Sequence, residues 1–175
     1  MTTVRAGIIT VSTRGASGTR ADESGPAMRD ALVGAGHEVV STQLVPDDVG
    51  RIANAILEAV RSGANAVLTS GGTGLSPNDV TPEATRRVID REVPGIAEAL
   101  RARSLAKTPH GMLSRGVAGS VGPALVVNLP GSPRAVRESL EVLLPALPHA
   151  IELLAGETGE TGHSHGRSAE PSPER

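Results

Sequence analysis

Three short apolar runs, each followed by a helical pattern, constrain the fold of this chain more than any other feature. The runs are Val4 to Val11, Glu38 to Val45 and Ala64 to Leu68. The first is rich in β-branched residues and apolar on both alternations, which is typical of a strand covered on both faces. Strands that alternate with helices form βαβ units. The sequence therefore predicts a three-layer α/β fold, with a mostly parallel central sheet, helices on both faces and right-handed crossovers.

Helical periodicity follows each run and dominates the second half of the chain. Gly34 and Gly63 mark the ends of the first two helices. Residues 114–121 and 124–129 form either a hairpin or two neighbouring strands, and the pattern does not distinguish the two. The expected helices cover residues 24–34, 52–60, 82–90, 95–105 and 133–154, with a loop over 107–112.

The amino-acid composition of the chain argues against several classes of function. The 175 residues are 38% apolar but include no Phe, Tyr or Trp, so the core must be aliphatic and no aromatic ring can stack on a base. A formal charge of -2 argues against non-specific binding to nucleic acid, which depends on many Lys and Arg contacts to phosphates. The absence of cysteine excludes disulfides, thiol nucleophiles and cysteine-based zinc sites.

The start of the chain carries no targeting pattern. No apolar run approaches the roughly 20 residues of a membrane helix, and residues 2–7 lack the pattern of a signal peptide. The sequence thus predicts a cytoplasmic protein with no membrane partner. Residues 1–155 are expected to form one domain. Residues 156–175, which include His163 and His165, have a polar composition without apolar periodicity, and this predicts a disordered tail.

Polar or glycine-rich loops follow the predicted strands, at Ser12, Asp47, Gly71 and Pro130. The carboxyl ends of parallel strands meet at one edge of an open sheet, where ligands bind, so we expect these four loops to converge. The Gly-Gly-Thr-Gly sequence from Gly71 lets the backbone approach a ligand closely. It has neither the ending of a Walker A loop nor the spacing of a dinucleotide fold. Taken alone, it is equally compatible with a turn that only reverses the chain.

Two carboxylates at different strand ends are the candidate metal ligands. Asp47 follows the second predicted strand, and Asp79 lies within the glycine-rich loop. Mg²⁺ is commonly held by one or two carboxylates together with substrate phosphates, whereas an isolated aspartate is more often a helix cap or a solvated residue. Asp47 is preferred to Asp48 as the ligand. Thr81 and Pro82 are expected to be the N-cap and first residue of the next helix.

Three arginines, Arg14, Arg115 and Arg134, are expected in loops on the same edge, where a guanidinium can hold a phosphate through two bonds. Of these, Arg115 is the preferred ligand. Helix starts at Ser132 and Thr81 add free N–H groups and a helix dipole that favour anions. No histidine has a catalytic context, and no GxSxG elbow is present.

The glycine-rich loop and the residues after it resemble a known signature. Thr-Ser-Gly-Gly-Thr-Gly from Thr69, followed by Asp-Val-Thr-Pro-Glu-Ala-Thr from Asp79, is similar to the signature of the MogA/MoaB family of molybdopterin-binding proteins, which includes the gephyrin G domain. The resemblance extends to about Leu154. Four further segments match in family order: Pro46-Asp47-Asp48, Val93-Pro94-Gly95, Leu113-Ser114-Arg115-Gly116 and Asn128-Leu129-Pro130-Gly131-Ser132-Pro133.

This resemblance implies a MogA/MoaB-like homotrimer and a molybdopterin adenylyltransferase of molybdenum cofactor biosynthesis. In the implied reaction the terminal phosphate of molybdopterin attacks the α-phosphate of ATP in the presence of Mg²⁺, giving adenylyl-molybdopterin and pyrophosphate. Asp47 and Asp79 are the implied catalytic and metal-holding residues, and a molybdenum-insertion protein is an implied partner. The implied substrate-binding residues are Ser12, Gly71, Gly72, Thr73, Gly74, Thr81, Ser114, Arg115, Pro130, Gly131 and Ser132.

Two positions depart from the family pattern. Family members often carry an acidic residue where this chain has Thr13, and a Phe where it has Ile96. The change at Thr13 leaves open a non-catalytic molybdopterin carrier of the MoaB type. A nucleotide-binding regulator unrelated to molybdenum is a further alternative, and a gephyrin-like scaffold is disfavoured because no second folded domain is expected after Leu154.

Overall fold

A six-stranded sheet forms the centre of the computed structural model, which describes residues 3–156. The strand order is β2-β1-β3-β6-β5-β4. Strands β2, β1, β3 and β6 pair in parallel, while β5 is antiparallel to both β6 and β4. This confirms the predicted mostly parallel sheet. The strands are β1 (Arg5–Val11), β2 (Glu38–Val45), β3 (Ala66–Ser70), β4 (Arg91–Glu92), β5 (Ala118–Val121) and β6 (Ala124–Leu129).

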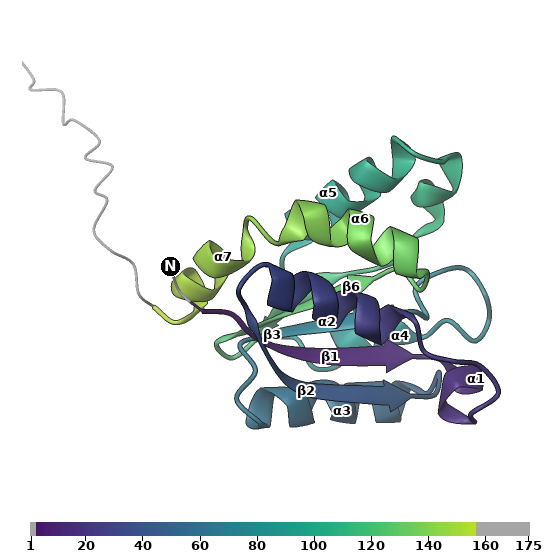
Figure 1. Cartoon of the computed structure of the whole chain (residues 1–175), viewed down its shortest axis with the longest axis horizontal. Coiled ribbons are helices and arrows are strands. Elements are labelled where there is room, and N and C mark those ends of the chain that lie inside the picture. Colours follow the sequence, from purple (N-terminus) through teal and green to yellow (C-terminus); the bar gives the residue numbers. More distant parts are fainter. Residues whose placement is uncertain (1–2, 157–175) are drawn as a thin grey trace, which may run out of the picture.

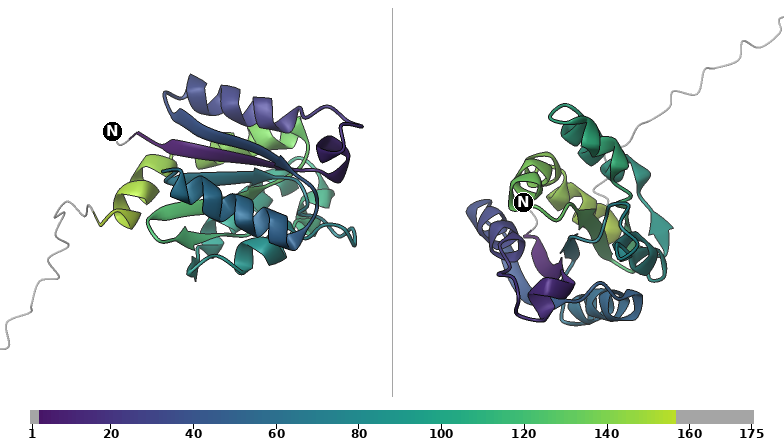
Figure 2. Two further views of the ribbon diagram at one scale, coloured as in Figure 1. Left: turned by 90° about the horizontal axis from the view of Figure 1, so that it is seen from below. Right: turned by 90° about the vertical axis from the view of Figure 1, so that its right-hand side faces the viewer.

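Helices cover both faces of the sheet, as Figure 2 shows with α2 and α3 on opposite sides. One face carries α2, α5, α6 and α7, and the other carries α3 and α4. The helices are α1 (Thr13–Ala16), α2 (Ser24–Gly34), α3 (Val49–Arg61), α4 (Thr81–Arg86), α5 (Pro94–Leu105), the 3-10 helix η1 (Pro109–Leu113), α6 (Pro133–Leu143) and α7 (Leu147–Leu154). None of the helices within residues 3–156 is long and apolar enough to cross a bilayer.

Successive residues of the central strands serve opposite cores, which explains why these strands are apolar on both alternations. Ile8 and Leu68 pack against α2, α6 and α7, whereas Ile9 and Val67 pack against α3. All four side chains are fully buried. The core is aliphatic, as the composition requires.

The strand order places a crevice between the loops that follow β1 and β3. From β1 the chain crosses to β2 on one side, and β3 then returns to the other side of β1. Such a reversal of direction leaves an opening at the carboxyl ends of the strands, where open parallel sheets bind ligands. In Figure 1 this edge is the right-hand side, where α1 lies beyond the arrowhead of β1.

Several element boundaries differ from those expected. The third strand extends to Ser70, two residues further than predicted, and buries Thr69 and Ser70. The loop after β1 contains the single helical turn α1, and the expected loop over 107–112 contains η1. The open choice for residues 114–129 is resolved as an antiparallel hairpin of β5 and β6, which turns at Gly122 with a φ of 53°.

The helix predicted over residues 82–90 is shorter than expected, because the residues at its predicted end pair with the sheet instead. It ends at Arg86, and the Asp90 N–H donates to the Ser120 carbonyl at 2.7 Å, just before β4. The prediction that Thr81 is the N-cap is wrong. Val80 occupies that position, and the Thr81 hydroxyl donates to the Gly71 carbonyl at 2.9 Å instead.

Candidate functional site

A cleft of about 860 Å³ opens at the carboxyl ends of the parallel strands. Loops after β1, β2, β3 and β6 all contribute to its lining, so the predicted convergence of four loops is confirmed. Seven of the predicted site residues lie on this cleft: Ser12, Asp47, Gly71, Gly72, Asp79, Gly131 and Ser132.

Asp47 is held on the cleft by the loop that follows β1. One carboxylate oxygen, Oδ2, accepts hydrogen bonds from the Thr13 N–H at 2.9 Å and from the Thr13 hydroxyl at 2.7 Å. The other oxygen, Oδ1, faces Gly72, where an added Cβ would lie 3.2 Å from it. The neighbouring Asp48 instead caps α3 by accepting from the Arg51 N–H at 2.8 Å. The two aspartates therefore have separate roles, and Asp47 is the one that lines the cleft.

The glycines at the end of β3 occupy space that no side chain could share. Gly71 has a φ of 99°, and an added Cβ would lie 2.3 Å from the Val11 carbonyl oxygen. Gly72 has a φ of 64°, and its Cβ would lie 2.4 Å from the Thr81 hydroxyl. Thr81 is fully buried, and its N–H donates to the Gly72 carbonyl at 3.0 Å. Buried Thr81 thus fixes the conformation of the loop through these contacts, while the backbone of Gly72 borders the cleft.

Asp79 reaches the same cleft from the far end of this loop. Its Oδ2 accepts from the Ser76 N–H at 3.0 Å, and its own N–H donates to the Ser76 carbonyl at 2.9 Å. A Cβ at Gly74 would lie 2.9 Å from that same Oδ2, so a side chain at this position would crowd the carboxylate.

The two carboxylates suit a cation that a substrate brings with it. Within residues 3–156 there is no group of three or more His, Cys, Asp or Glu side chains placed to hold a metal ion. Mg²⁺ keeps several waters and is typically bound by one or two carboxylates plus substrate phosphates, so Asp47 and Asp79 fit that mode of binding.

Arg115 does not line this cleft, although it was the preferred phosphate ligand. Its Nε donates to the Gly74 carbonyl at 2.7 Å, its Nη2 donates to the Asp79 carbonyl at 2.5 Å, and its Nη1 pairs with the Glu83 carboxylate. Its backbone N–H also donates to the Thr73 carbonyl at 2.8 Å. Hydrogen bonding from Arg115 holds the pKa of Glu83 below its usual value. Arg115 therefore ties both ends of the loop that carries Asp79.

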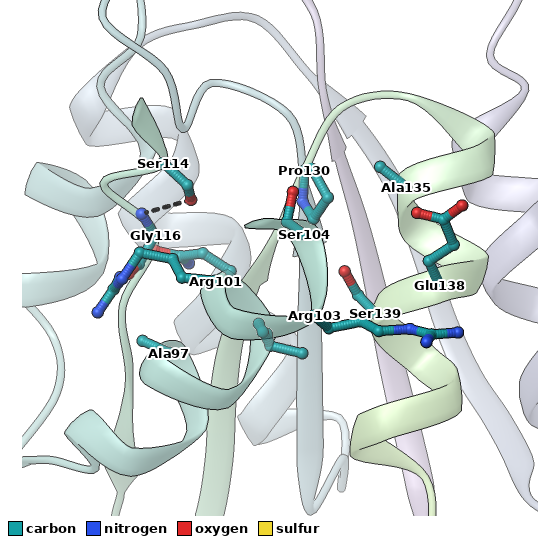
Figure 3. Close-up of a pocket in the computed structure, with 12 residues that line it drawn as sticks. Ala97, Arg101, Arg103, Ser104, Ser114, Gly116, Pro130, Ala135, Glu138 and Ser139 are labelled. Atoms are coloured by element: carbon teal, nitrogen blue, oxygen red, sulfur yellow. Dashed lines mark hydrogen bonds between the residues drawn. The ribbon is translucent and has the colours of Figure 1, made fainter. Parts of the chain in front are cut away.

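Ser114 and Pro130 lie at a second, smaller cavity of about 40 Å³, between α5 and α6. Figure 3 shows the Ser114 hydroxyl turned toward the Gly116 backbone, from which it accepts a hydrogen bond at 3.3 Å. Ala97 and Arg101 approach this cavity from α5, and α6 closes its other side. The predicted site residues are therefore divided into three groups: those on the large cleft, those at this cavity, and those that support the loop, namely Thr73, Gly74, Thr81 and Arg115.

Sequence reasoning missed Asp22, which also lines the large cleft. Its Oδ2 accepts from the Thr10 hydroxyl at 2.9 Å, and its Oδ1 accepts from the N–H groups of Ser24 and Gly25, each at 3.0 Å. The Ser24 hydroxyl in turn donates to the Gly131 carbonyl at 2.8 Å. An aspartate two residues before a Ser-Gly-Pro helix start is a capping pattern, and that signal was available in the sequence.

Comparison with known proteins agrees with this geometry. Residues 7–149 match the family described as "Probable molybdopterin binding domain". The molybdopterin adenylyltransferase of Escherichia coli is 38% identical over 176 residues, covering 92% of this chain and 90% of that protein. The crystal structure of the molybdopterin biosynthesis enzyme MoaB from Thermus thermophilus is 52% identical, with a TM-score of 0.82, covering 87% of this chain and 97% of that one.

A longer relative matches through one part only. Gephyrin from Dictyostelium discoideum is 38% identical over 158 residues, which are 85% of this chain but 22% of gephyrin. This chain therefore spans about a fifth of the length of that protein. The family match over most of the chain, together with relatives of similar length and a shared fold, confirms the resemblance seen in the loop motifs: the chain belongs to the MogA/MoaB family of molybdopterin-binding domains, which serves molybdenum cofactor biosynthesis.

Proposed function

We propose that this chain is a molybdopterin adenylyltransferase that uses Mg-ATP. The observation that carries the proposal is the placement of Asp47 and Asp79 on one cleft, which the backbone of Gly71 and Gly72 also lines. The enzyme class also agrees with relatives of that name that match most of the chain. In the reaction, an oxygen of the molybdopterin terminal phosphate forms a bond to the α-phosphorus of ATP. The bond between the α-phosphorus and its bridging oxygen breaks, and pyrophosphate leaves.

The residues of the cleft suit a reaction that depends on positioning and charge. Phosphoryl-type transfer needs no nucleophile from the protein, because the substrate phosphate supplies it. Mg²⁺, when bound, neutralises charge on the phosphates. Asp47 and Asp79 would hold that ion, and Thr13 orients Asp47 by occupying its Oδ2.

Backbone groups supply the rest of the proposed phosphate site. The Gly71 N–H donates to the Leu129 carbonyl at 3.2 Å and is not free for a phosphate, so the Gly72 amide is the proposed donor. Ser132 caps α6 by accepting from the Ala135 N–H at 3.2 Å, which places the amino end of α6 at the cleft. The dipole at the start of a helix favours an anion.

The remaining predicted ligands have different proposed roles. Ser114 and Pro130 border the smaller cavity, and we propose them as contacts on the pterin side. Ser12 caps α1 through its hydroxyl, which accepts from the Gly15 N–H at 3.0 Å, and so shapes the cleft wall. Thr73, Gly74, Thr81 and Arg115 act by holding the loop.

Incubation of the purified protein with molybdopterin and Mg-ATP tests this function. Adenylylated pterin and pyrophosphate are the expected products. Asp79→Asn should abolish turnover while pterin binding stays measurable. The matched control is Asp48→Asn, which should retain activity because Asn caps a helix as well as Asp does. Absence of product, with a known adenylyltransferase active alongside, would reject the proposal.

A non-catalytic molybdopterin carrier of the MoaB type is the second candidate. Thr13 favours it, because this residue has a hydroxyl that donates to the Asp47 carboxylate, as its backbone N–H also does, and is not a further acid. Tight pterin binding without any ATP-dependent product would support the carrier.

Assembly and location complete the proposal. We propose a homotrimer in the cytoplasm, with residues 1–155 as the folding unit and a molybdenum-insertion protein as partner.

The predicted disorder of the tail concerns residues that, apart from Gly156, lie outside the described range. Light scattering coupled to gel filtration would measure the mass of the assembly, and a monomer at micromolar concentration would reject the trimer.

A further inference from the structure

Two arginines from one loop lie on the wall of the large cleft. Arg14 is within α1 and Arg20 follows that turn, and both side chains are exposed. The Arg14 carbonyl organises the loop, because it accepts from the N–H groups of Thr19 at 2.9 Å and Arg20 at 3.1 Å. It also accepts from the hydroxyls of Ser17 at 3.1 Å and Thr19 at 3.0 Å. The backbone between the two arginines is therefore held in one compact turn.

The charge of the cleft makes these two arginines important. Its charged lining residues are the acids Asp22, Glu23, Asp47 and Asp79 and the bases Arg14 and Arg20. Four carboxylates against two guanidinium groups leave a net negative wall. A phosphate chain would be repelled by that wall unless cations offset it.

Other arginines near the same edge are already engaged. The three guanidinium nitrogens of Arg115 bond the loop that carries Asp79 and the Glu83 carboxylate. Arg134 pairs with Glu138 on the next turn of α6, at 3.0 Å, and does not line the cleft. Among the residues the structure describes, Arg14 and Arg20 are thus the cations that face the cleft.

We propose that Arg14 and Arg20 bind the phosphate chain of the nucleotide, an inference that rests on the proposed function and adds its phosphate-binding cations. A guanidinium binds phosphate oxygens through two parallel N–H bonds, which suits a polyphosphate. Arg14 also lies next to the proposed metal site. Its sequence neighbour Thr13 donates two hydrogen bonds to the carboxylate of Asp47. Binding of the phosphate chain by this loop keeps it beside the proposed metal-holding carboxylate.

The test uses the full chain and inorganic tripolyphosphate as a probe, with binding followed by calorimetry. The variants are Arg14→Gln, Arg20→Gln and the double change. The control is Arg29→Gln, because Arg29 is an exposed arginine on α2 outside the cleft and its loss changes the net charge equally. Thermal unfolding curves of all variants should match the wild type, since the changed side chains are exposed.

Each single change should weaken tripolyphosphate binding about 3- to 10-fold, and the double change about 10- to 100-fold. Arg29→Gln should leave binding unchanged. Raising the salt concentration should weaken the wild type more than the double variant, because salt screens the lost interactions. The KM for ATP should rise in the double variant by a similar factor.

The outcomes separate this inference from the proposed function. Adenylylation with the same ATP KM and the same tripolyphosphate affinity in the double variant would overturn the role of the arginines alone. Tripolyphosphate binding that depends on both arginines, without any adenylylated product, would overturn the proposed function alone. No tripolyphosphate binding by the wild type would overturn the role of the arginines.

Discussion

The Arg115 guanidinium donates from Nη2 to the main-chain oxygen of Asp79 at 2.5 Å, which joins two residues separated by 36 positions in the chain. The same side chain reaches the Gly74 carbonyl and the Glu83 carboxylate. One arginine from the segment before β5 thus fixes the loop that delivers a proposed metal-holding carboxylate. The position of Asp79 depends on a contact that its own sequence neighbourhood does not provide.

Replacement of Arg115 by Lys should therefore lower both stability and activity. Lysine keeps the charge but cannot bond three acceptors in a planar fork. We expect a loss of about 1–3 kcal/mol in the free energy of unfolding and at least a tenfold lower kcat. Urea unfolding and adenylylation assays would measure both. Arg86→Lys, at an exposed ion pair with Glu92, should change neither by much, and full activity in Arg115→Lys would contradict the positioning role.

The Glu83–Arg115 pair should make the free energy of unfolding depend on pH. The pKa of Glu83 is lowered in the folded protein by its hydrogen bond to Arg115, so the contribution of the pair to stability is fully present above the unfolded pKa of this carboxyl group. That contribution is lost as the pH falls through the lower folded pKa. Because both side chains are partly exposed, with 34% and 45% accessibility for Arg115 and Glu83, we expect less than about 1 kcal/mol.

Urea unfolding of the wild type and Glu83→Gln across acid and neutral pH measures this contribution. The wild type should be the more stable at pH about 7, and the difference should shrink as the pH falls through the lowered folded pKa of Glu83, where this carboxylate becomes protonated. A difference that stays constant over this range would show that the ion pair is not its source.

Thr13→Val should weaken the hold on Asp47 without altering the fold. Valine keeps the shape but removes the hydroxyl that donates to Asp47 at 2.7 Å and accepts from the Asp47 N–H at 3.1 Å. The loss of about 1 kcal/mol corresponds to a five- to tenfold lower kcat/KM, measured with Mg²⁺ varied. Thr42→Val, at an exposed position on β2, is the control. Equal kcat/KM values in the two variants would show that the Thr13 hydroxyl does not contribute to the function of the site.

Gly72→Ala should lower the free energy of unfolding by more than the positive φ angle at this position would cost by itself. The new Cβ would lie 2.4 Å from the Thr81 hydroxyl, which is bonded to the Gly71 carbonyl. Gly122 has a φ of 53° with nothing within 4 Å of a Cβ, so Gly122→Ala measures the cost of the backbone angle alone. We expect Gly72→Ala to exceed that cost by about 1–3 kcal/mol in unfolding free energy and to lose activity. Equal destabilisation by the two changes would show that the crowding at Gly72 is relieved.

Local patterns were sufficient for most elements. The predicted bounds of β2 coincide with those observed, because its apolar run and the turns at its ends are properties of neighbouring residues. Asp48 acts as a helix cap through a bond to the N–H three residues later, which is also a local effect. By contrast, β4 escaped prediction, since its two residues are held by pairing with β5 and not by their own propensity.

The sequence by itself determined the order of the longer strands and helices, the aliphatic core and the loops that carry Asp47, Asp79 and the glycines. These follow from periodicity, turn residues and chain order, which are local. Only the tertiary structure decided that Arg115 turns inward to the loop, that Asp22 joins the cleft, and that Arg14 and Arg20 are the cations left facing it. The physical reason is that a guanidinium or carboxylate binds whichever partners the fold brings within about 3 Å, and those partners are distant in sequence.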